Sequence, residues 1–83
     1  MSIRVKVLYF GQSRDASGSA EEEFYLPDRA PLRALVESAT ARHKKLETLK
    51  GIMKVALNEE LAEGTERLKD GDVVAFIPPV AGG

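Results

Sequence analysis

The residues with the clearest chemical potential are the last two, Gly82-Gly83, which end a run of prolines and small residues. Glycine has no Cβ, so such an end passes through a narrow channel and leaves the terminal carbonyl open to attack. A carboxylate becomes an acyl donor only after activation, for example as an acyl-adenylate, and the chain has no P-loop to bind a nucleotide. We therefore expect Gly83 to be the reacting residue of a carrier protein that another protein activates. The alternative is a chain end without a role, since termini commonly fray.

Two prolines separate this end from the last apolar run. Pro78 and Pro79 lack N–H donors and have a restricted φ, so they end strand pairing and stiffen the exit of the chain. Six residues follow Ile77, and at roughly 3.3 Å each they span roughly 20 Å when extended. We expect a globular domain over 1–77 and a flexible tail over 78–83. The tail is expected to insert into a partner's active site through Pro78, Pro79, Val80, Ala81, Gly82 and Gly83.

The domain that positions the tail is predicted from hydrophobic periodicity. β-branched and aromatic residues predict strands over 3–10, 21–26, 52–57 and 73–77, and a short extended stretch begins at Leu61. The residues 11–20 are rich in Gly and Ser and are expected to form a loop. An apolar stripe predicts a helix that begins at Pro31 and fades near His43; its members are Leu32, Leu35, Val36 and Ala39. Leu46 and Leu49 are expected to pack a short turn beneath the sheet.

This order of elements, β-β-α-β-(short β)-β, predicts an α+β fold. One main helix can cover one face of a mixed sheet, and the first and last strands, if adjacent, run parallel. That arrangement is the β-grasp, or ubiquitin-like, fold. Turns are expected at 58–60 and, from the Asp70-Gly71 pair, at 69–72.

Strand alternation assigns side chains to two faces of the predicted sheet. Ile3, Val5, Val7 and Tyr9 form the core face of the first strand, and Val74 and Phe76 that of the last. Apolar residues also fall on the outward face, and we expect them to form a docking patch made of Leu8, Phe10, Leu61 and Ile77. The alternative is that Phe10 and Ile77 fold into the core through a bulge or twist.

Composition excludes several classes of function. The 83 residues include no cysteine, which rules out disulfides, thiolate metal sites and sulfur carried on a side-chain thiol. A formal net charge of -1 gives no electrostatic case for nucleic acid or an anionic membrane. The apolar runs are too short to span a bilayer and the start shows no signal-peptide core, so a cytoplasmic location is expected. We expect no metal and no cofactor bound by this chain alone.

Other polar residues are interpreted as structural. His43 stands beside Lys44 and Lys45, where a cation at a helix C-terminus is favourable. The run 21–23 is three glutamates, which alternate between faces of a strand and predict a solvated edge rather than a cation site. The basic stretch 42–50 is expected to be a solvated helix end with at most a steering role. Asp70 and Asp72 are expected to be turn residues.

Three segments together resemble a known family. The opening strand Val5-Lys6-Val7-Leu8-Tyr9-Phe10-Gly11-Gln12, the turn Asn58-Glu59-Glu60-Leu61 and the ending, residues 68–83, are similar to the small, sulfur-carrying subunit of molybdopterin synthase. The specific part is Asp-Gly-Asp before the last strand and Pro-Pro-Val-x-Gly-Gly after it. The resemblance runs from end to end, and the loops at 11–20 and 44–51 match only in character.

The resemblance implies a sulfur-donating function. An E1-like adenylating enzyme would activate the carboxylate of Gly83 with ATP, and a sulfurtransferase would supply the sulfur of a thiocarboxylate. The tail would then donate this sulfur to precursor Z, cyclic pyranopterin monophosphate, in the active site of the large subunit. The catalytic side chains would belong to that subunit, which meets the outward face of the sheet, in a heterotetramer. This chain would not itself be an enzyme.

Three other classes remain open. A related carrier for thiazole synthesis or tRNA thiolation shares the fold and the Gly-Gly end, although Pro78-Pro79 favours the molybdopterin branch. A protein modifier conjugated to lysines is a second class. A plain interaction module is a third.

Overall fold

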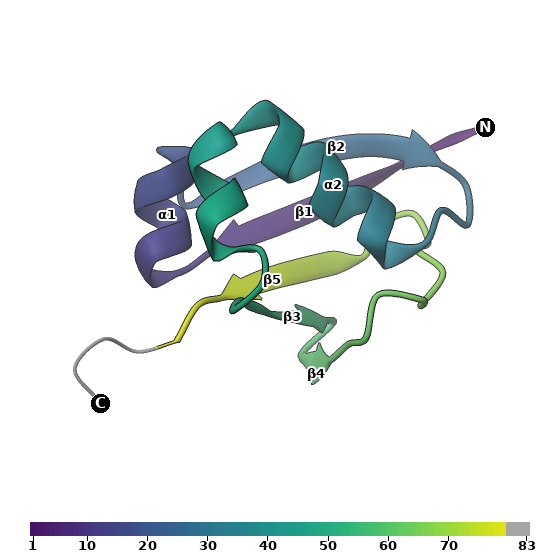
Figure 1. Cartoon of the computed structure of the whole chain (residues 1–83). Coiled ribbons are helices and arrows are strands. Elements are labelled where there is room, and N and C mark those ends of the chain that lie inside the picture. The colour runs from purple at the N-terminus through teal and green to yellow at the C-terminus, as the bar shows by residue number, and fades with distance from the viewer. Residues whose placement is uncertain (80–83) are drawn as a thin grey trace.

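The computed structural model describes residues 1–79, which form five strands and three short helices. The strands are β1 (Ser2–Tyr9), β2 (Glu21–Pro27), β3 (Lys54–Leu57), β4 (Glu60–Leu61) and β5 (Val73–Ile77). The helices are α1 (Gly11–Ser17), α2 (Leu32–Arg42) and the 3-10 helix η1 (Lys44–Leu49). The strands form one mixed sheet in the order β2-β1-β5-β3-β4 (Figure 1).

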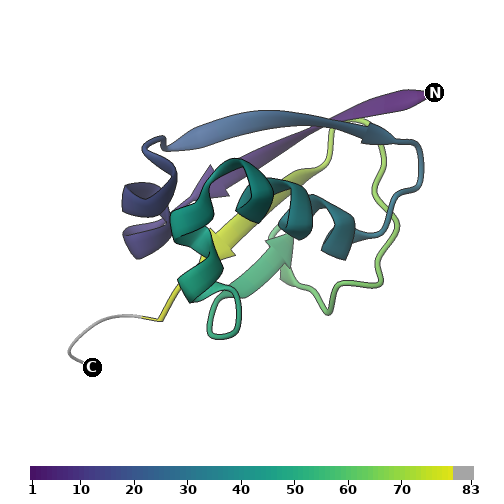
Figure 2. The ribbon, with the colours of Figure 1, turned by 45° about the horizontal axis from the view of Figure 1, so that its top comes forward.

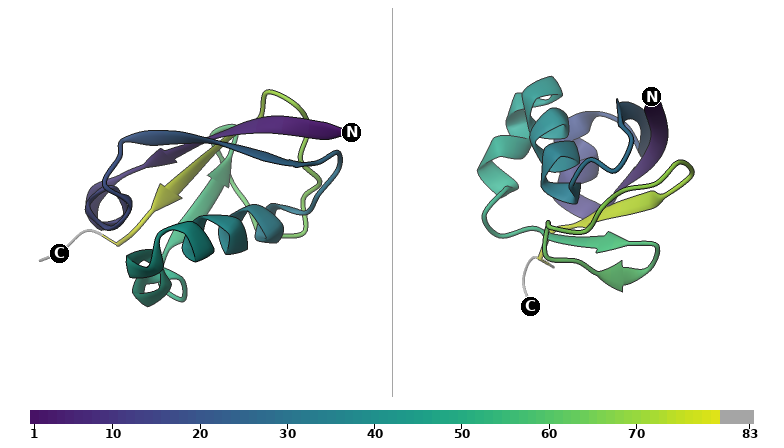
Figure 3. Two further views of the ribbon diagram at one scale, coloured as in Figure 1. Left: turned by 90° about the horizontal axis from the view of Figure 1, so that it is seen from above. Right: turned by 90° about the vertical axis from the view of Figure 1, so that its right-hand side faces the viewer.

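The helices lie on one face of this sheet and leave the other face open. Figures 2 and 3 show α2 crossing the sheet on the same side as η1, and within residues 1–79 no helix lies on the opposite side. β1 and β5 are parallel neighbours, and every other pair in the sheet is antiparallel. A parallel pair needs a long crossover, which the intervening elements supply. The predicted β-grasp arrangement is confirmed.

The core lies between the sheet and the helices. The side chains that alternation assigns to the inner face of β1 are buried, as are Val74 and Phe76 of β5. From the helical layer, α2 contributes its apolar stripe, in which Leu32, Leu35 and Ala39 are buried and Val36 is half-buried. Leu46 and Leu49 of η1 are buried too, which confirms the short turn expected beneath the sheet. Alternation and helical periodicity therefore identify most of the core.

The expectation of a loop over 11–20 is wrong in its first part, because α1 occupies Gly11–Ser17. The Gly and Ser residues taken as loop markers instead begin and end this helix. Ser13 Oγ accepts a hydrogen bond from the Phe10 N–H at 3.0 Å, within the first turn. Gly18 has a φ of 77° and donates its N–H to the Arg14 carbonyl, which closes the helix. A helix this short has no apolar periodicity that sequence could reveal.

The third strand is shorter than predicted. It begins at Lys54 rather than at Ile52. The N–H groups of Ile52 and Met53 both donate to the Leu49 carbonyl, so these residues continue the turn that follows η1. The Ile52 side chain is exposed. An apolar, β-branched residue was therefore a misleading strand signal here.

The two predicted turns beside β5 are confirmed and joined by hydrogen bonds. Gly71 has a φ of 89°, the left-handed conformation that favours glycine in a tight turn. The buried Asp72 carboxylate accepts hydrogen bonds from the Lys69 N–H at 2.8 Å and from Asn58 Nδ2 at 3.0 Å. Asn58 Oδ1 in turn accepts from the Val73 N–H at 2.9 Å. These bonds hold the β3–β4 turn against the start of β5.

Candidate functional site: the open sheet face and the exit of the C-terminal segment

A row of apolar side chains crosses the open face of the sheet. Leu8 of β1 lies opposite Ala75 of β5, Ala75 lies opposite Ala56 of β3, and Ala56 lies opposite Leu61 of β4. Residues paired in this way point to the same side of a sheet. The two middle members of the row, on β5 and β3, are alanines, and the two end members, on β1 and β4, are leucines. The row is therefore low in the middle and higher at its ends.

A shallow hollow lies over the part of this row that belongs to β1 and β5. It encloses about 460 Å³ and is lined by Leu8, Phe10, Asn58, Glu59, Val73 and Ala75. Its floor is apolar, and one side is the turn held by Asn58 and Asp72. Asn58 and Glu59 have φ values of 50° and 74°, a conformation unfavourable for non-glycine residues, which the hydrogen bonds between Asn58 and the start of β5 help to maintain. The hollow can accept an apolar side chain from a partner.

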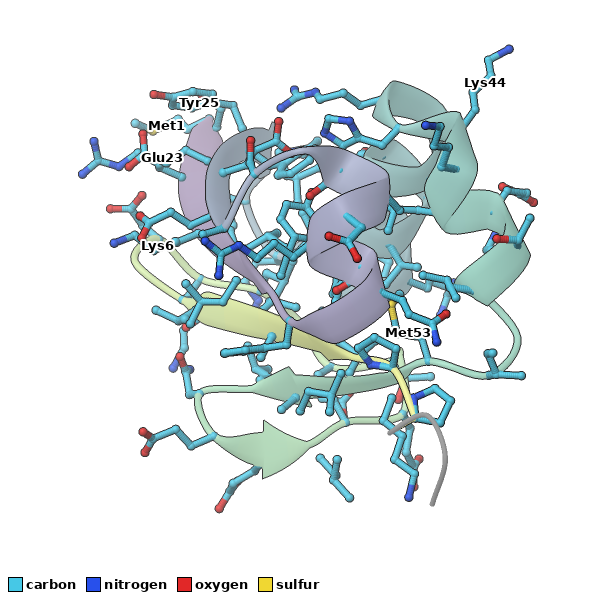
Figure 4. The ribbon with its side chains drawn as sticks, turned by 90° about the vertical axis from the view of Figure 1, so that its left-hand side faces the viewer. Met1, Lys6, Glu23, Tyr25, Lys44 and Met53 are labelled. Atoms are coloured by element: carbon cyan, nitrogen blue, oxygen red, sulfur yellow. The ribbon has the colours of Figure 1, made fainter. Side chains whose placement is uncertain are left out.

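The other half of the open face is charged. Arg4 and Lys6 of β1 face Glu23 and Glu21 of β2, with N–O distances of 3.8 and 3.4 Å. Figure 4 shows Lys6 and Glu23 projecting on the side of the sheet away from the helices. Exposed pairs of this kind add little stability. The open face is thus divided into a charged half over β1–β2 and an apolar half over β5, β3 and β4.

The four residues of the predicted docking patch fall on the apolar half or at its border. Phe10 is 50% exposed, Ile77 38% and Leu61 68%, while Leu8 is partly covered. Leu8 and Phe10 line the same hollow, Leu61 closes the far end of the row, and Ile77 lies opposite Lys54 at the end of β5. The alternative in which Phe10 and Ile77 fold into the core is wrong. Binding through the patch remains a prediction.

The chain leaves the sheet beside this patch. Pro78, the first residue of the predicted tail, is buried, and Pro79 is exposed. A Cβ placed on Gly11 would lie 3.6 Å from Pro78 Cγ, so α1 begins directly against this proline. Val80, Ala81, Gly82 and Gly83 lie outside the described residues, and so does the carboxylate that carries the predicted chemistry. The described part ends within reach of the docking patch.

A polar network that the sequence did not predict lies beneath the sheet. Tyr9 donates its hydroxyl proton to Glu22 Oε1 at 2.7 Å, and His43 Nε2 lies 2.8 Å from the same oxygen. Arg42 Nη1 is 3.7 Å from Glu22 Oε2, and its guanidinium stacks 4.1 Å from the centre of the Phe24 ring. The expectation of a fully solvated edge is therefore wrong for Glu22. Strand alternation could have identified this position from the sequence, because it puts Glu22 on the same face of β2 as Phe24 and Leu26.

The network shifts the ionisation of two of its members. Burial of Glu22 opposes its charged form, but hydrogen bonds from Tyr9 and His43 and the charges of His43 and Arg42 outweigh this effect, so the pKa of Glu22 lies below its ordinary value. Burial, followed by the bond to Glu22, raises the pKa of Tyr9 far above its ordinary value. Both groups stay in the form that the hydrogen bond requires at neutral pH. The network stabilises the junction of β1, β2 and the end of α2.

Metal and membrane sites are not found in the described part of the chain. Within residues 1–79, no three His, Cys, Asp or Glu side chains come together as a metal site. Across the same residues, no helix has the length and apolar character needed to cross a bilayer.

Comparison with known proteins decides the family. The model of the ThiS family matches residues 7–83, almost the whole chain and all of the tail. The chain belongs to the ThiS family. The molybdopterin synthase sulfur carrier subunit of Chlamydomonas reinhardtii is 41% identical over 83 residues, which cover 98% of this chain and 100% of the relative. The resemblance drawn from the opening strand and the ending is confirmed.

Solved structures agree with this family. A putative molybdopterin converting factor, subunit 1, from Pyrococcus furiosus superposes with a TM-score of 0.85 at 37% identity, over 94% of this chain and 99% of the other. A protein–protein complex of subunits 1 and 2 of the molybdopterin-converting factor from Helicobacter pylori contains a chain 32% identical to this one. It superposes with a TM-score of 0.68 over 98% of this chain and 100% of that chain.

Proposed function

We propose that this chain is the sulfur-carrier subunit of a molybdopterin synthase and that its reacting group is the carboxylate of Gly83. One observation carries the proposal: β5 ends beside the apolar half of an open sheet face, so the docking patch and the start of the tail are adjacent. A partner bound to this face receives the tail directly. The names of ThiS-family relatives support sulfur transfer as the purpose.

The proposed chemistry has two stages before transfer. An E1-like enzyme joins the Gly83 carboxylate to the α-phosphate of ATP, which releases pyrophosphate and forms an acyl-adenylate. A persulfide on a sulfurtransferase then attacks this carbonyl and displaces AMP, and a thiol reductant cleaves the resulting acyl disulfide, which leaves a thiocarboxylate and an oxidised disulfide. ATP is thus a substrate of the partner, and this chain binds no cofactor of its own.

The thiocarboxylate is then used in the large subunit of the synthase. The tail, Pro78 to Gly83, enters the active site of that subunit and gives its sulfur to precursor Z. The catalytic side chains belong to the large subunit, so this chain acts as a donor and not as an enzyme. We propose a heterotetramer, with one carrier at each end of a large-subunit dimer, in the cytoplasm. The Helicobacter pylori complex supports the pairing of a small with a large subunit.

Intact mass after co-expression with a cognate activating enzyme and sulfurtransferase tests the first part. The expected product is a chain with one oxygen replaced by sulfur at Gly83, whereas a ladder of higher-mass conjugates would indicate a protein modifier. If sulfur on Gly83 were delivered to a thiazole or a tRNA and not to precursor Z, the chain would be a related carrier instead.

A variant with one residue added after Gly83 tests the position of the reacting group. We expect it to fold normally and to transfer no sulfur, because Gly83 then carries a peptide bond and the free carboxylate is displaced by one residue, about 3.3 Å. The matched control adds the same residue before Met1, which is fully exposed and precedes the first residue of β1. Conversion of precursor Z by the C-terminally extended chain would disprove the central role of Gly83.

A further inference from the structure

Residues at the start of α1 hold the end of β5 in place. The Phe76 carbonyl accepts a hydrogen bond from the Phe10 N–H at 3.3 Å, and Ser13 Oγ lies 3.3 Å from the same carbonyl. The Phe76 ring is buried and meets the Tyr9 ring edge-on, with 5.5 Å between centroids. Both the backbone and the side chain of Phe76 are therefore held, two residues before the tail begins.

Ser13 is the central member of these contacts. Its side chain is fully buried, at 0% exposure, and its hydroxyl donates to the Phe10 carbonyl at 2.6 Å while accepting from the Phe10 N–H at 3.0 Å. A hydroxyl has one proton, so the longer contact to the Phe76 carbonyl is a shared, weaker bond. The hydroxyl thus joins the first turn of α1 to the last residue of β5 that pairs with β1.

A second contact holds the chain two residues later. Gly11 has a φ of 52° and packs against the buried Pro78, which leaves room for little more than a methyl group between them. The exposed Ile77 lies between the two held residues, Phe76 and Pro78. We call Gly11, Ser13, Phe76 and Pro78 the exit anchor. Because Pro78 also has a restricted φ, the direction of the chain at this point is determined by the fold.

We propose that Ser13 is a positioning residue for sulfur transfer, acting through the exit anchor on the direction in which the tail leaves the domain. The inference rests on the proposed function. Pro79 follows Pro78 and also has a restricted φ, so an error of direction at the exit anchor is carried into the start of the tail and is not absorbed at its base. Misplacement of reacting atoms by about 1 Å can reduce a rate by about 100-fold. The bonds between Ser13 and Phe10 involve only the Phe10 backbone, and the Phe10 side chain that belongs to the docking patch is not part of the exit anchor. Loss of the Ser13 hydroxyl should therefore affect transfer more than binding.

The test compares binding with single-turnover transfer in the assembled synthase. Ser13→Ala is loaded with sulfur, and its affinity for the large subunit and its rate of transfer to precursor Z are measured separately. We expect affinity within about twofold of wild type and a transfer rate at least about tenfold lower. Ser13→Cys fills nearly the same space with a weaker hydrogen-bonding group, and an intermediate rate is expected; it carries the test if Ser13→Ala does not fold.

Two controls separate positioning from general destabilisation. Ser17→Ala removes another hydroxyl of α1, one that bonds the backbone of Arg14 and Ser19 and not β5, and transfer should be unchanged. In a Pro78→Gly background, where the direction of the tail is already released, Ser13→Ala should lower transfer little further, whereas a merely structural role gives additive losses.

The outcomes are distinct. A wild-type chain that takes up no sulfur overturns the proposed function and this inference with it. A wild-type chain that transfers sulfur while Ser13→Ala transfers it equally fast overturns the inference alone. So does a parallel loss of affinity and transfer in Ser13→Ala, or additive effects with Pro78→Gly.

Discussion

Replacing Phe10 by glutamate tests the docking patch most directly. Phe10 is 50% exposed in the free chain, and aromatic side chains bury roughly 150–250 Å² in full. A partner that covers the exposed half removes roughly 75–125 Å² from water, which is worth about 2–3 kcal/mol at about 25 cal/mol per Å². A carboxylate left without a partner in that interface costs at least about 1–3 kcal/mol more. Affinity for the large subunit should therefore fall by at least about 100-fold.

The same substitution should affect the free chain less. A glutamate at position 10 can extend into water through the open half of its surroundings, so only the packing of the buried half of the ring is lost. The backbone bonds from Phe10 to Ser13 and Phe76 do not depend on the side chain. We expect the free energy of unfolding to fall by about 1–2 kcal/mol, below the loss in binding.

Tyr25→Glu is the matched control. Tyr25 is an aromatic residue on the same open face, 67% exposed, but it lies opposite Arg4 in the charged half. The substitution also replaces an aromatic ring by one negative charge, so any general electrostatic effect on association is shared. Affinity for the large subunit is measured by calorimetry and stability by urea denaturation. Equal affinities of wild type and Phe10→Glu would refute the docking patch, and equal losses in Phe10→Glu and Tyr25→Glu would show that charge alone is responsible.

Two further predictions concern stability. The pKa of Glu22 is lowered in the folded chain, so its contribution is full above the ordinary value of 4.5 and is lost as pH falls below it. Glu22→Gln should therefore lower the free energy of unfolding by about 2 kcal/mol at neutral pH, and its difference from wild type should shrink toward pH 3; a constant difference would contradict the network. Gly71→Ala should cost about 1–2 kcal/mol by thermal denaturation, since φ is 89° although no atom lies within 4 Å of the added Cβ. Gly51→Ala has the same free space without a positive φ, and a similar loss there would exclude backbone strain as the cause.

Local patterns predicted the elements that carry strong periodicity. Alternation in β1 and β5 separates buried Val5 and Phe76 from outward Leu8 and Ile77, because a strand has only two faces. The apolar stripe of α2 and the Asp70-Gly71 turn were also predicted from local sequence. α1 was missed because its seven residues are too few for a helical period, and its capping residues look like loop residues. β3 was extended too far because Ile52 suits a strand, whereas hydrogen bonds to Leu49 keep it in a turn.

The candidate site likewise has a part that the sequence could predict and a part that it could not. Pro78-Pro79 and Gly82-Gly83 are visible in the sequence, and together with the family resemblance they led to the prediction of a carrier. The place where this tail leaves the domain depends on contacts between residues more than sixty positions apart, such as Ser13 with Phe76. No local pattern encodes such a pair.

By itself, the sequence determined the β-grasp class and the core faces, because both follow from periodicity. The reacting role of Gly83 stays a prediction. Only the tertiary structure decided that a parallel β1–β5 pair places the end of β5 beside Phe10 and α1. It also decided that Glu22 is bound by Tyr9 and His43 and that Ser13 holds the Phe76 carbonyl. These are long-range contacts, and their geometry arises only when the chain closes its sheet over the helices.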